Sequence, residues 1–192
     1  MARNVEFDEE TAVRKAMDVF WEKGYKGTSL RDLTEAMKIN SSSLYNTIGD
    51  KQVLFVRCVK MYTDLRKKDL DERMKSGKSP LTTLVNFIND SVKVIIEDDN
   101  GCMAVKAAFE MDSTDKQLKD ILQADSQSTY KFLTRLIKKA IEQGEMSADE
   151  DPELLADYFL SMWTGWNESF ILHKDAAKIR KMAQYFIKQL SR

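Results

Sequence analysis

Small hydrogen-bonding side chains crowd one stretch near the N-terminus of this 192-residue chain. They are Ser41, Ser42, Ser43, Asn46 and Thr47. On a helix, short donors and acceptors of this kind can enter the major groove of DNA and reach the edges of the bases. Tyr45 lies among them and Lys51 follows, and both suit contacts with phosphates, which fix the register of a protein on the duplex. The pattern therefore indicates a DNA-contacting helix.

An ordinary surface helix is the alternative interpretation of the same stretch. Three consecutive serines weaken a helix, and exposed helices more often use Glu, Lys or Ala. This composition favours the DNA-contacting interpretation.

Two short helices with a tight turn between them are predicted to position these side chains. Thr28 can cap the first helix and Asn40 the second, because their side-chain oxygens accept unpaired amides of the first turn. Gly49 can end the second helix in a left-handed conformation. The inward faces repeat at helical spacing: Leu30, Leu33 and Met37 in the first helix, Leu44 and Ile48 in the second. Such a pair is a helix-turn-helix, whose second helix enters the groove.

An earlier amphipathic helix, from about Asp8 to Lys23, is predicted to support this pair and complete a three-helix head. Its buried stripe would be Val13, Ala16, Met17, Phe20 and Trp21.

The segment GTSLRDLTEAMKINSSSLYNTIGDKQVLF resembles the DNA-binding signature of the tetracycline-repressor (TetR) family of bacterial regulators, and the similarity covers about Val13 to Tyr62. The chain departs from the common pattern at Thr47 and Ile48, where an aromatic pair is usual, and at Lys38, where glycine is frequent. The resemblance implies a homodimeric regulator, most often a repressor, that leaves DNA when its C-terminal part binds a small molecule. We expect the DNA contacts to be Thr28, Ser29, Arg31, Ser41, Ser42, Ser43, Tyr45, Asn46, Thr47 and Lys51.

Composition is typical of a mostly helical protein. Charged residues make up 32% and hydrophobic residues 43%, with seven Gly and two Pro. The net charge of −1 argues against a general polyanion binder, but a sequence-specific DNA binder needs only a local basic patch.

An all-α fold of about nine helices is predicted, with a DNA-binding domain at residues 1–50 and an effector-binding and dimerisation domain at residues 51–192. Asp50 would cap a long helix reaching about Ser76, which makes it the obvious mechanical link between the two domains.

The last two predicted helices carry more apolar surface than one packing face requires. Two helices from each of two copies would form a four-helix bundle, and a two-fold dimer predicts a palindromic operator. The expected interface residues are Tyr158, Met162, Gly165, Trp166, Ile179, Met182 and Phe186.

A small-molecule pocket is expected between the helices of the C-terminal domain, with Asp125 as a polar anchor. The candidate lining residues are Tyr62, Ile88, Val92, Phe109, Asp125, Thr129, Leu133, Trp163 and Asn167. Ordinary core residues have the same spacing, so core packing is the alternative for each of them.

Cys102 offers a different trigger, a cysteine that senses oxidants or electrophiles. It is predicted to begin a short helix ending near Met111, where the helix dipole favours a thiolate, and Lys106 one turn later adds positive charge. The alternative is a small, packed residue. Cys58 lies on a predicted buried stripe and is expected to be inert. Two cysteines far apart in sequence do not indicate a disulfide framework or a zinc site.

Enzymes are excluded by the absence of any assembled chemistry in the sequence. His173 is the only histidine, and there is no metal-ligand cluster, glycine-rich phosphate loop or nucleophile elbow. We therefore expect no cofactor. No apolar run approaches the roughly 18 residues of a membrane span, and no signal peptide is evident, so a cytoplasmic location is expected. A helical interaction protein that does not bind DNA is the remaining alternative, and it would leave the polar Ser41–Thr47 face unexplained.

Overall fold

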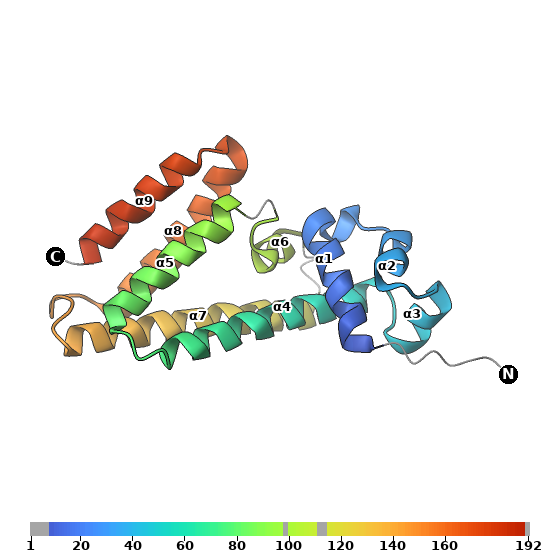
Figure 1. The fold of residues 1–192 in the computed structure, drawn as a ribbon, viewed down its shortest axis with the longest axis horizontal. Coiled ribbons are helices and arrows are strands. Elements are labelled where there is room, and N and C mark those ends of the chain that lie inside the picture. The colour runs from blue at the N-terminus through green and yellow to red at the C-terminus, as the bar shows by residue number, and fades with distance from the viewer. Residues whose placement is uncertain (1–7, 98–99, 111–114, 191–192) are drawn as a thin grey trace. The chain divides into compact units, whose positions relative to one another are not determined.

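The computed structural model describes residues 8–97, 100–110 and 115–190, which form nine α-helices and no strand (Figure 1). The helices are α1 (Glu9–Gly27), α2 (Leu30–Met37), α3 (Ser41–Thr47), α4 (Lys51–Met74), α5 (Pro80–Glu97), α6 (Met103–Glu110), α7 (Lys116–Glu142), α8 (Pro152–His173) and α9 (Ala176–Leu190). The predicted all-α class and helix order are confirmed. Met111, predicted to end the sixth helix, lies outside the described residues.

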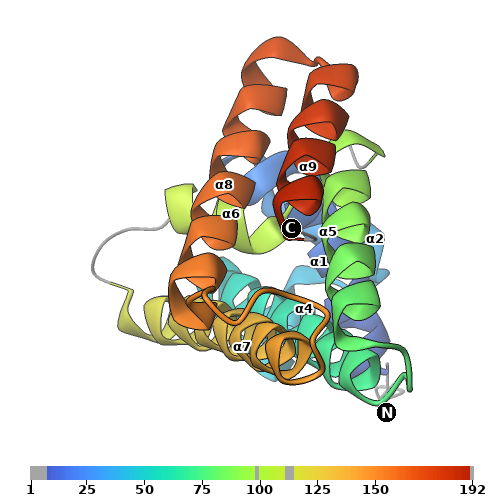
Figure 2. The same ribbon diagram turned by 90° about the vertical axis from the view of Figure 1, so that its left-hand side faces the viewer.

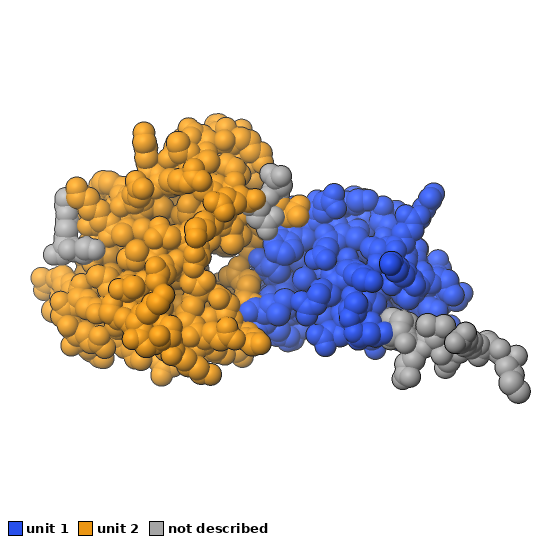
Figure 3. Space-filling view, in the orientation of Figure 1, with its two compact units in different colours: residues 1–65, 103–122 blue, residues 66–102, 123–192 orange. Residues whose placement is uncertain are grey.

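The chain divides into two compact units (Figure 3). Unit 1 comprises residues 1–65 and 103–122, and unit 2 comprises residues 66–102 and 123–192. These units do not coincide with the predicted domains 1–50 and 51–192. The first part of α4 belongs to unit 1 because its apolar face, including Leu54, Cys58 and Val59, is fully buried there. The short helix α6 and the start of α7 belong to unit 1 as well.

Unit 1 has a core of apolar side chains from its first four helices. Phe20 of α1 packs edge-on against Phe55 of α4, with ring centroids 5.0 Å apart. Leu33 of α2 and Leu44 of α3 are fully buried. The inward faces predicted from helical spacing are thus confirmed for both helices of the helix-turn-helix.

Unit 2 is a helical bundle in which α9 lies beside both α5 and α8, as the two orthogonal views show (Figures 1 and 2). Its core combines side chains from α5, α7, α8 and α9: Leu84, Ile88, Val92, Leu133, Leu136, Phe159, Ile179 and Ala183. The apolar side chains of these four helices are therefore largely internal to this unit.

One predicted helix cap is wrong. Thr28 is only 2% exposed, and its hydroxyl donates a hydrogen bond to the carbonyl of Gly24 (2.6 Å). Ser29 caps α2 instead, because Asp32 three residues later completes a reciprocal capping box with it. The caps predicted at Asn40 and Asp50 are confirmed by hydrogen bonds from the amides of Ser43 and Val53.

Candidate nucleic-acid interface and effector region

The polar face of α3 lies on the surface of unit 1. Its inner side is fixed by Leu44 and Ile48, which are buried, and its first turn is held by the Asn40 side chain, which accepts the amide of Ser43 at 2.7 Å. The outer side chains are exposed, except that Ser43 is half-buried: Ser41, Ser42, Ser43, Tyr45, Asn46 and Thr47. The side chain of Tyr45 is 50% exposed. The structure thus brings six of the predicted DNA contacts together on one short helix.

The start of α2 is fixed by charge as well as by its cap. The carboxylate of Asp32 accepts hydrogen bonds from the backbone and hydroxyl of Ser29 (2.8 and 2.6 Å) and from the ammonium of Lys23 (2.6 Å). The hydrogen bond from Lys23, followed by those from Ser29, holds the pKa of Asp32 well below its ordinary 3.8. Ser29 and Arg31 are exposed, and Arg31 forms an exposed ion pair with Glu35 at 2.7 Å. Both remain available for DNA, whereas the buried Thr28 does not belong to this surface.

Lys51, the first residue of α4, lies over an aromatic ring that the sequence did not single out. Its ammonium is 4.5 Å from the centroid of Tyr25, and the ring of Tyr25 also packs against Phe55 at 4.9 Å. A cation held over a ring in this way keeps a defined position without losing its charge. Tyr25 lies just beyond Lys23, the predicted end of the first helix, and only its aromatic character could have drawn attention to it.

A polar cluster inside unit 2 is centred on Arg66 of α4. Its guanidinium lies 3.3 Å from the carboxylate of Asp125, 3.4 Å from the hydroxyl of Thr129 and 3.3 Å from the thiol sulfur of Cys102. The ring of Trp163 lies 5.8 Å from the same guanidinium. The side chain of Asp125 is only 9% exposed, and burial raises its pKa above the ordinary 3.8 while Arg66 opposes the shift. Four of these residues were predicted from the sequence as site residues. Arg66 was not, because an arginine in a charged helical stretch gives no sign of burial.

Trp163 contributes an unsatisfied donor beside this cluster. Its indole N–H is buried and has no hydrogen-bond partner in the described part of the chain. Its backbone carbonyl accepts the side-chain amide of the buried Asn167 at 2.8 Å. A buried donor without a partner costs free energy that a bound acceptor would recover.

The other predicted pocket residues lie elsewhere. Ile88, Val92 and Leu133 are core residues of unit 2. Tyr62 and Phe109 belong to unit 1, where the ring of Tyr62 packs edge-on against Trp21 (5.2 Å) and Phe109 is 81% exposed. The side chain of Phe109 is therefore on the surface of its own unit rather than enclosed within it.

The expected partnership of Cys102 with Lys106 is wrong. The ammonium of Lys106 donates to the backbone carbonyl of Trp21 at 2.9 Å. Arg66 instead supplies the positive group beside Cys102, which directly precedes α6 and is 3% exposed. The other cysteine, Cys58, is buried with its thiol donating to the carbonyl of Val13, and burial raises the pKa of that thiol.

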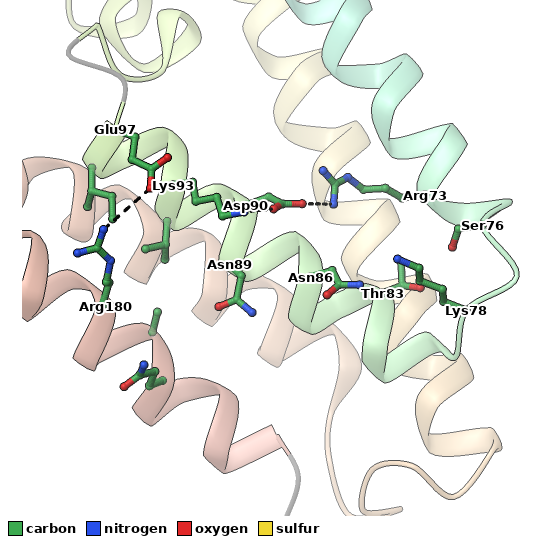
Figure 4. A pocket seen from close by; sticks show the side chains of 14 residues that line it. Arg73, Ser76, Lys78, Thr83, Asn86, Asn89, Asp90, Lys93, Glu97 and Arg180 are labelled. Carbon is green, nitrogen blue, oxygen red and sulfur yellow. Dashed lines mark hydrogen bonds and ion pairs between the residues drawn. The ribbon is translucent and has the colours of Figure 1, made fainter.

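A polar groove of about 590 Å³ on unit 2 was not predicted from the sequence (Figure 4). Side chains from the end of α4, from α5 and from α9 line it. Its charges largely neutralise one another: Arg73 pairs with Asp90 at 2.9 Å, and Arg180 lies 4.0 Å from Glu97. Val92 is the only predicted pocket residue that lines this groove. The polar residues of the groove were not predicted, because in the sequence they resemble the solvated face of an ordinary surface helix.

An apolar groove of about 500 Å³ runs between α8 and α9. Five of the predicted interface residues line it: Tyr158, Met162, Trp166, Met182 and Phe186. Gly165 is exposed, whereas Ile179 is fully buried in the core of unit 2 and presents no surface to a partner. The same two helices expose further large apolar side chains: Leu154, Ile171, Leu172 and Tyr185.

Two kinds of site are not found in the described ranges. No group of three or more His, Cys, Asp or Glu side chains there could hold a metal ion. No helix among the described residues is long and apolar enough to cross a bilayer.

A helix-turn-helix with an exposed polar second helix, attached to an all-α body, defines a DNA-binding transcriptional regulator. Family models agree with both parts. "Bacterial regulatory proteins, tetR family" matches residues 12–58, and "Tetracyclin repressor-like, C-terminal domain" matches residues 80–186. The chain belongs to the TetR family. It is therefore a transcriptional regulator and not an enzyme.

Curated relatives support this assignment. The HTH-type transcriptional regulator YezE of Bacillus subtilis (strain 168) is 30% identical over 82% of this chain and 83% of its own length. The HTH-type transcriptional repressor DhaR of Mycobacterium sp. (strain GP1) is 24% identical over 80% of this chain and 77% of its own length.

Solved structures share the fold over nearly the whole chain. A cysteine mutant of the TetR-family regulator CifR, bound to a 26-base-pair operator, is 25% identical with a TM-score of 0.82, covering 98% of this chain and 100% of its own. The reduced form of Escherichia coli NemR has the same TM-score at 14% identity, covering 92% of this chain and 93% of its own, and shows likeness of fold alone.

Proposed function

We propose that this protein is a homodimeric repressor that binds a palindromic operator by placing α3 of each copy in the major groove. The observation that carries the proposal is the exposed polar face of α3 above the buried Leu44 and Ile48. Ser42 and Asn46 would contact base edges, while Tyr45 and Lys51 would contact phosphates. The operator complex of CifR and the repressor DhaR support this proposal. We further propose that the protein acts in the cytoplasm, where its DNA target lies.

Gel-shift titration against palindromic fragments from the protein's own promoter tests this function. We expect a shift that weakens steeply with added salt, because phosphate contacts release counterions. Ser42→Ala and Asn46→Ala should change which base pairs are preferred, by about 1–3 kcal/mol per lost contact. Failure to shift any genomic fragment at low salt would favour a helical interaction protein instead.

The groove between α8 and α9 is proposed to bind the same groove of a second copy. Its lining is largely apolar, and large apolar side chains around it are exposed, which is typical of a face that is buried in a dimer. Met182→Glu should convert the dimer to a monomer in sedimentation equilibrium. Ser161→Glu is the matched control, since Ser161 is exposed on α8 but does not line the groove. A monomeric native protein at micromolar concentration would contradict this assignment.

A small molecule is proposed to act at the Arg66 cluster of unit 2. The cluster offers the Arg66 guanidinium as a donor and the buried carboxylate of Asp125 as an acceptor. The indole N–H of Trp163, which has no partner among the described residues, is a second donor. Together these groups suit a compound that carries both hydrogen-bond acceptors and donors. In the Trp163→Phe variant, a higher concentration of the compound should be needed to release the protein from the operator. The affinity of this variant for the operator in the absence of the compound should equal that of the native protein. An unaltered response in that variant would exclude Trp163 from the site.

A second trigger is favoured by the position of Cys102. Its sulfur accepts a hydrogen bond from the Arg66 guanidinium at 3.3 Å, so oxidation or alkylation of this thiol would alter a contact of the Arg66 cluster. We expect Cys102→Ser to bind the operator normally and to keep it in the presence of an oxidant. If that variant is released by oxidant as readily as the native protein, Cys102 is only a packed residue.

A further inference from the structure

The first helix is broken close to its end. Gly24 has φ 73° and ψ 171°, far from helical values, although helical structure continues on both sides of it. In an uninterrupted helix the N–H of Tyr25 would donate to the carbonyl of Trp21, four residues earlier. The turn of the backbone at Gly24 directs these two groups away from each other.

Two side chains of α6 bind the groups that the break releases. The ammonium of Lys106 donates to the carbonyl of Trp21 at 2.9 Å. The carboxylate of Glu110 accepts the N–H of Tyr25 at 2.5 Å. Lys106 and Glu110 are four residues apart on one helix face, so a single helical turn of α6 replaces the hydrogen bond missing from α1. We call this pair of contacts the α6 clamp.

The fit of the clamp depends on the absence of a side chain at residue 24. A Cβ built on Gly24 would lie 2.2 Å from a carboxylate oxygen of Glu110, and the positive φ is itself unfavourable for other residues. Glu110 therefore occupies space that only glycine leaves open. This close fit is specific to the broken conformation of α1.

Tyr25 connects the clamp to a predicted DNA contact. Its backbone N–H is held by Glu110, and its ring lies under the ammonium of Lys51 at 4.5 Å. The same ring packs against Phe55 of α4. All of these residues belong to unit 1, so the contacts run from α6 through one residue of α1 to the first residue of α4.

We infer that Lys106 and Glu110 are positioning residues, which hold Tyr25 and thereby keep the Lys51 ammonium in place to bind an operator phosphate. The inference rests on the proposed DNA-binding function but adds a role for α6 to it.

The salt dependence of operator binding tests this role. Each phosphate contact contributes about 0.9 to the slope of log affinity against log salt, so loss of the Lys51 contact from both copies of a dimer should lower it by about 1.8. We expect Lys51→Ala and Glu110→Ala each to lower the slope by this amount. The double variant should show no further decrease, since both changes remove the same contact.

Matched variants separate positioning from general structural support. Glu110→Gln keeps an acceptor for the Tyr25 amide and should retain the native slope. Glu22→Ala removes an exposed carboxylate from the same unit and should also retain it, which controls for the loss of charge. Tyr25→Leu leaves the backbone N–H to Glu110 but removes the ring under Lys51, and should lower the slope even if Glu110→Ala is too unstable to measure.

The outcomes distinguish failure of this inference from failure of the proposed function. A native slope in Lys51→Ala would mean that Lys51 does not contact phosphate, which overturns the assignment on which the inference rests. A lowered slope in Lys51→Ala with a native slope in Glu110→Ala or in Tyr25→Leu would overturn the clamp alone. Additive losses in the double variant would show that Glu110 acts independently of Lys51.

Discussion

Two aspartates, Asp32 in unit 1 and Asp125 in unit 2, differ in how their carboxylates are stabilised and in the direction of their pKa shifts. Asp32 of unit 1 lies near the surface, with partners close in sequence, and the hydrogen bonds from Lys23 and Ser29 lower its pKa. Asp125 of unit 2 is buried beside Arg66, which comes from another helix, and burial raises its pKa. In unit 1, the short helix α2 is thus stabilised by a cap whose residues are close in sequence. The body instead contains a polar cluster whose cost is offset only by tertiary contacts.

Truncating one core leucine in each unit should have the largest effects on stability. Leu44 of α3 and Leu133 of α7 are both fully buried, and leucine-to-alanine changes at such sites cost about 2–5 kcal/mol. If the units unfold separately, Leu44→Ala should shift the urea transition reported by Trp21, and Leu133→Ala the one reported by Trp163 and Trp166. Single-tryptophan versions measured by fluorescence give the two transitions. Equal shifts of every probe would show that the units unfold together and would weaken the comparison.

Removing the carboxylate of Asp125 should have the next largest effect. Asp125→Ala removes the carboxylate that lies 3.3 Å from the partly buried Arg66 guanidinium and is expected to cost about 1–3 kcal/mol in chemical denaturation.

The pH dependence of Asp125 has a defined sign. Since its pKa is raised in the folded state, the folded protein binds more protons than the unfolded chain between pH 3.8 and the folded-state pKa. The contribution of Asp125 to stability therefore falls as pH rises through that window. Asp125→Asn should abolish this fall while keeping most of the hydrogen bonding. An unchanged pH profile would mean that Asp125 is more solvated than its burial indicates.

Loss of the α3 cap should have a smaller effect. Asn40→Ala leaves the Ser43 amide without its acceptor and is expected to cost about 1 kcal/mol of unfolding free energy. Asn40→Asp should retain the cap. Asn89→Ala removes an exposed amide inside α5. It is the matched control in unit 2 and should not lower stability, because Ala favours a helix interior more than Asn does.

The smallest effect is expected at Asp32, because its ion pair with Lys23 is exposed and screened. Its pKa is lowered in the folded state, so its contribution to stability is present above pH 3.8 and is lost as the pH falls toward the folded-state pKa. Thermal melts of Asp32→Asn and native protein should therefore converge at low pH. If Asp32 and Asp125 instead gave pH effects of the same sign, the contrast between the units would be wrong.

Much of unit 1 could be predicted because its elements are defined by residues close in sequence. The α3 cap at Asn40, the inward Leu44 and Ile48, and the exposed polar face all follow from local spacing. Thr28 was misassigned since two adjacent hydroxyl residues compete for one cap, and the capping box with Asp32 decides in favour of Ser29.

Unit 2 and the contacts of α6 were less predictable because they depend on which helices meet. Periodicity marks a buried face but not its neighbour, so it could not separate core residues such as Ile179 from an interface. Nor could it show that Arg66 is the partner of Cys102 or that Lys106 binds the backbone of α1. The break at Gly24 creates that binding site, and a glycine near a helix end gave no indication of it.

The continuity of α4 and α7 across the boundary between the units bears on protein engineering. Each helix passes from one unit into the other without a linker, so the hydrogen-bond ladder has no break at which sequences could be joined freely. Deleting one residue from such a helix turns everything beyond it by about 100°. Exchange of sensor parts between relatives should therefore succeed only when both helices keep their residue register at the junction.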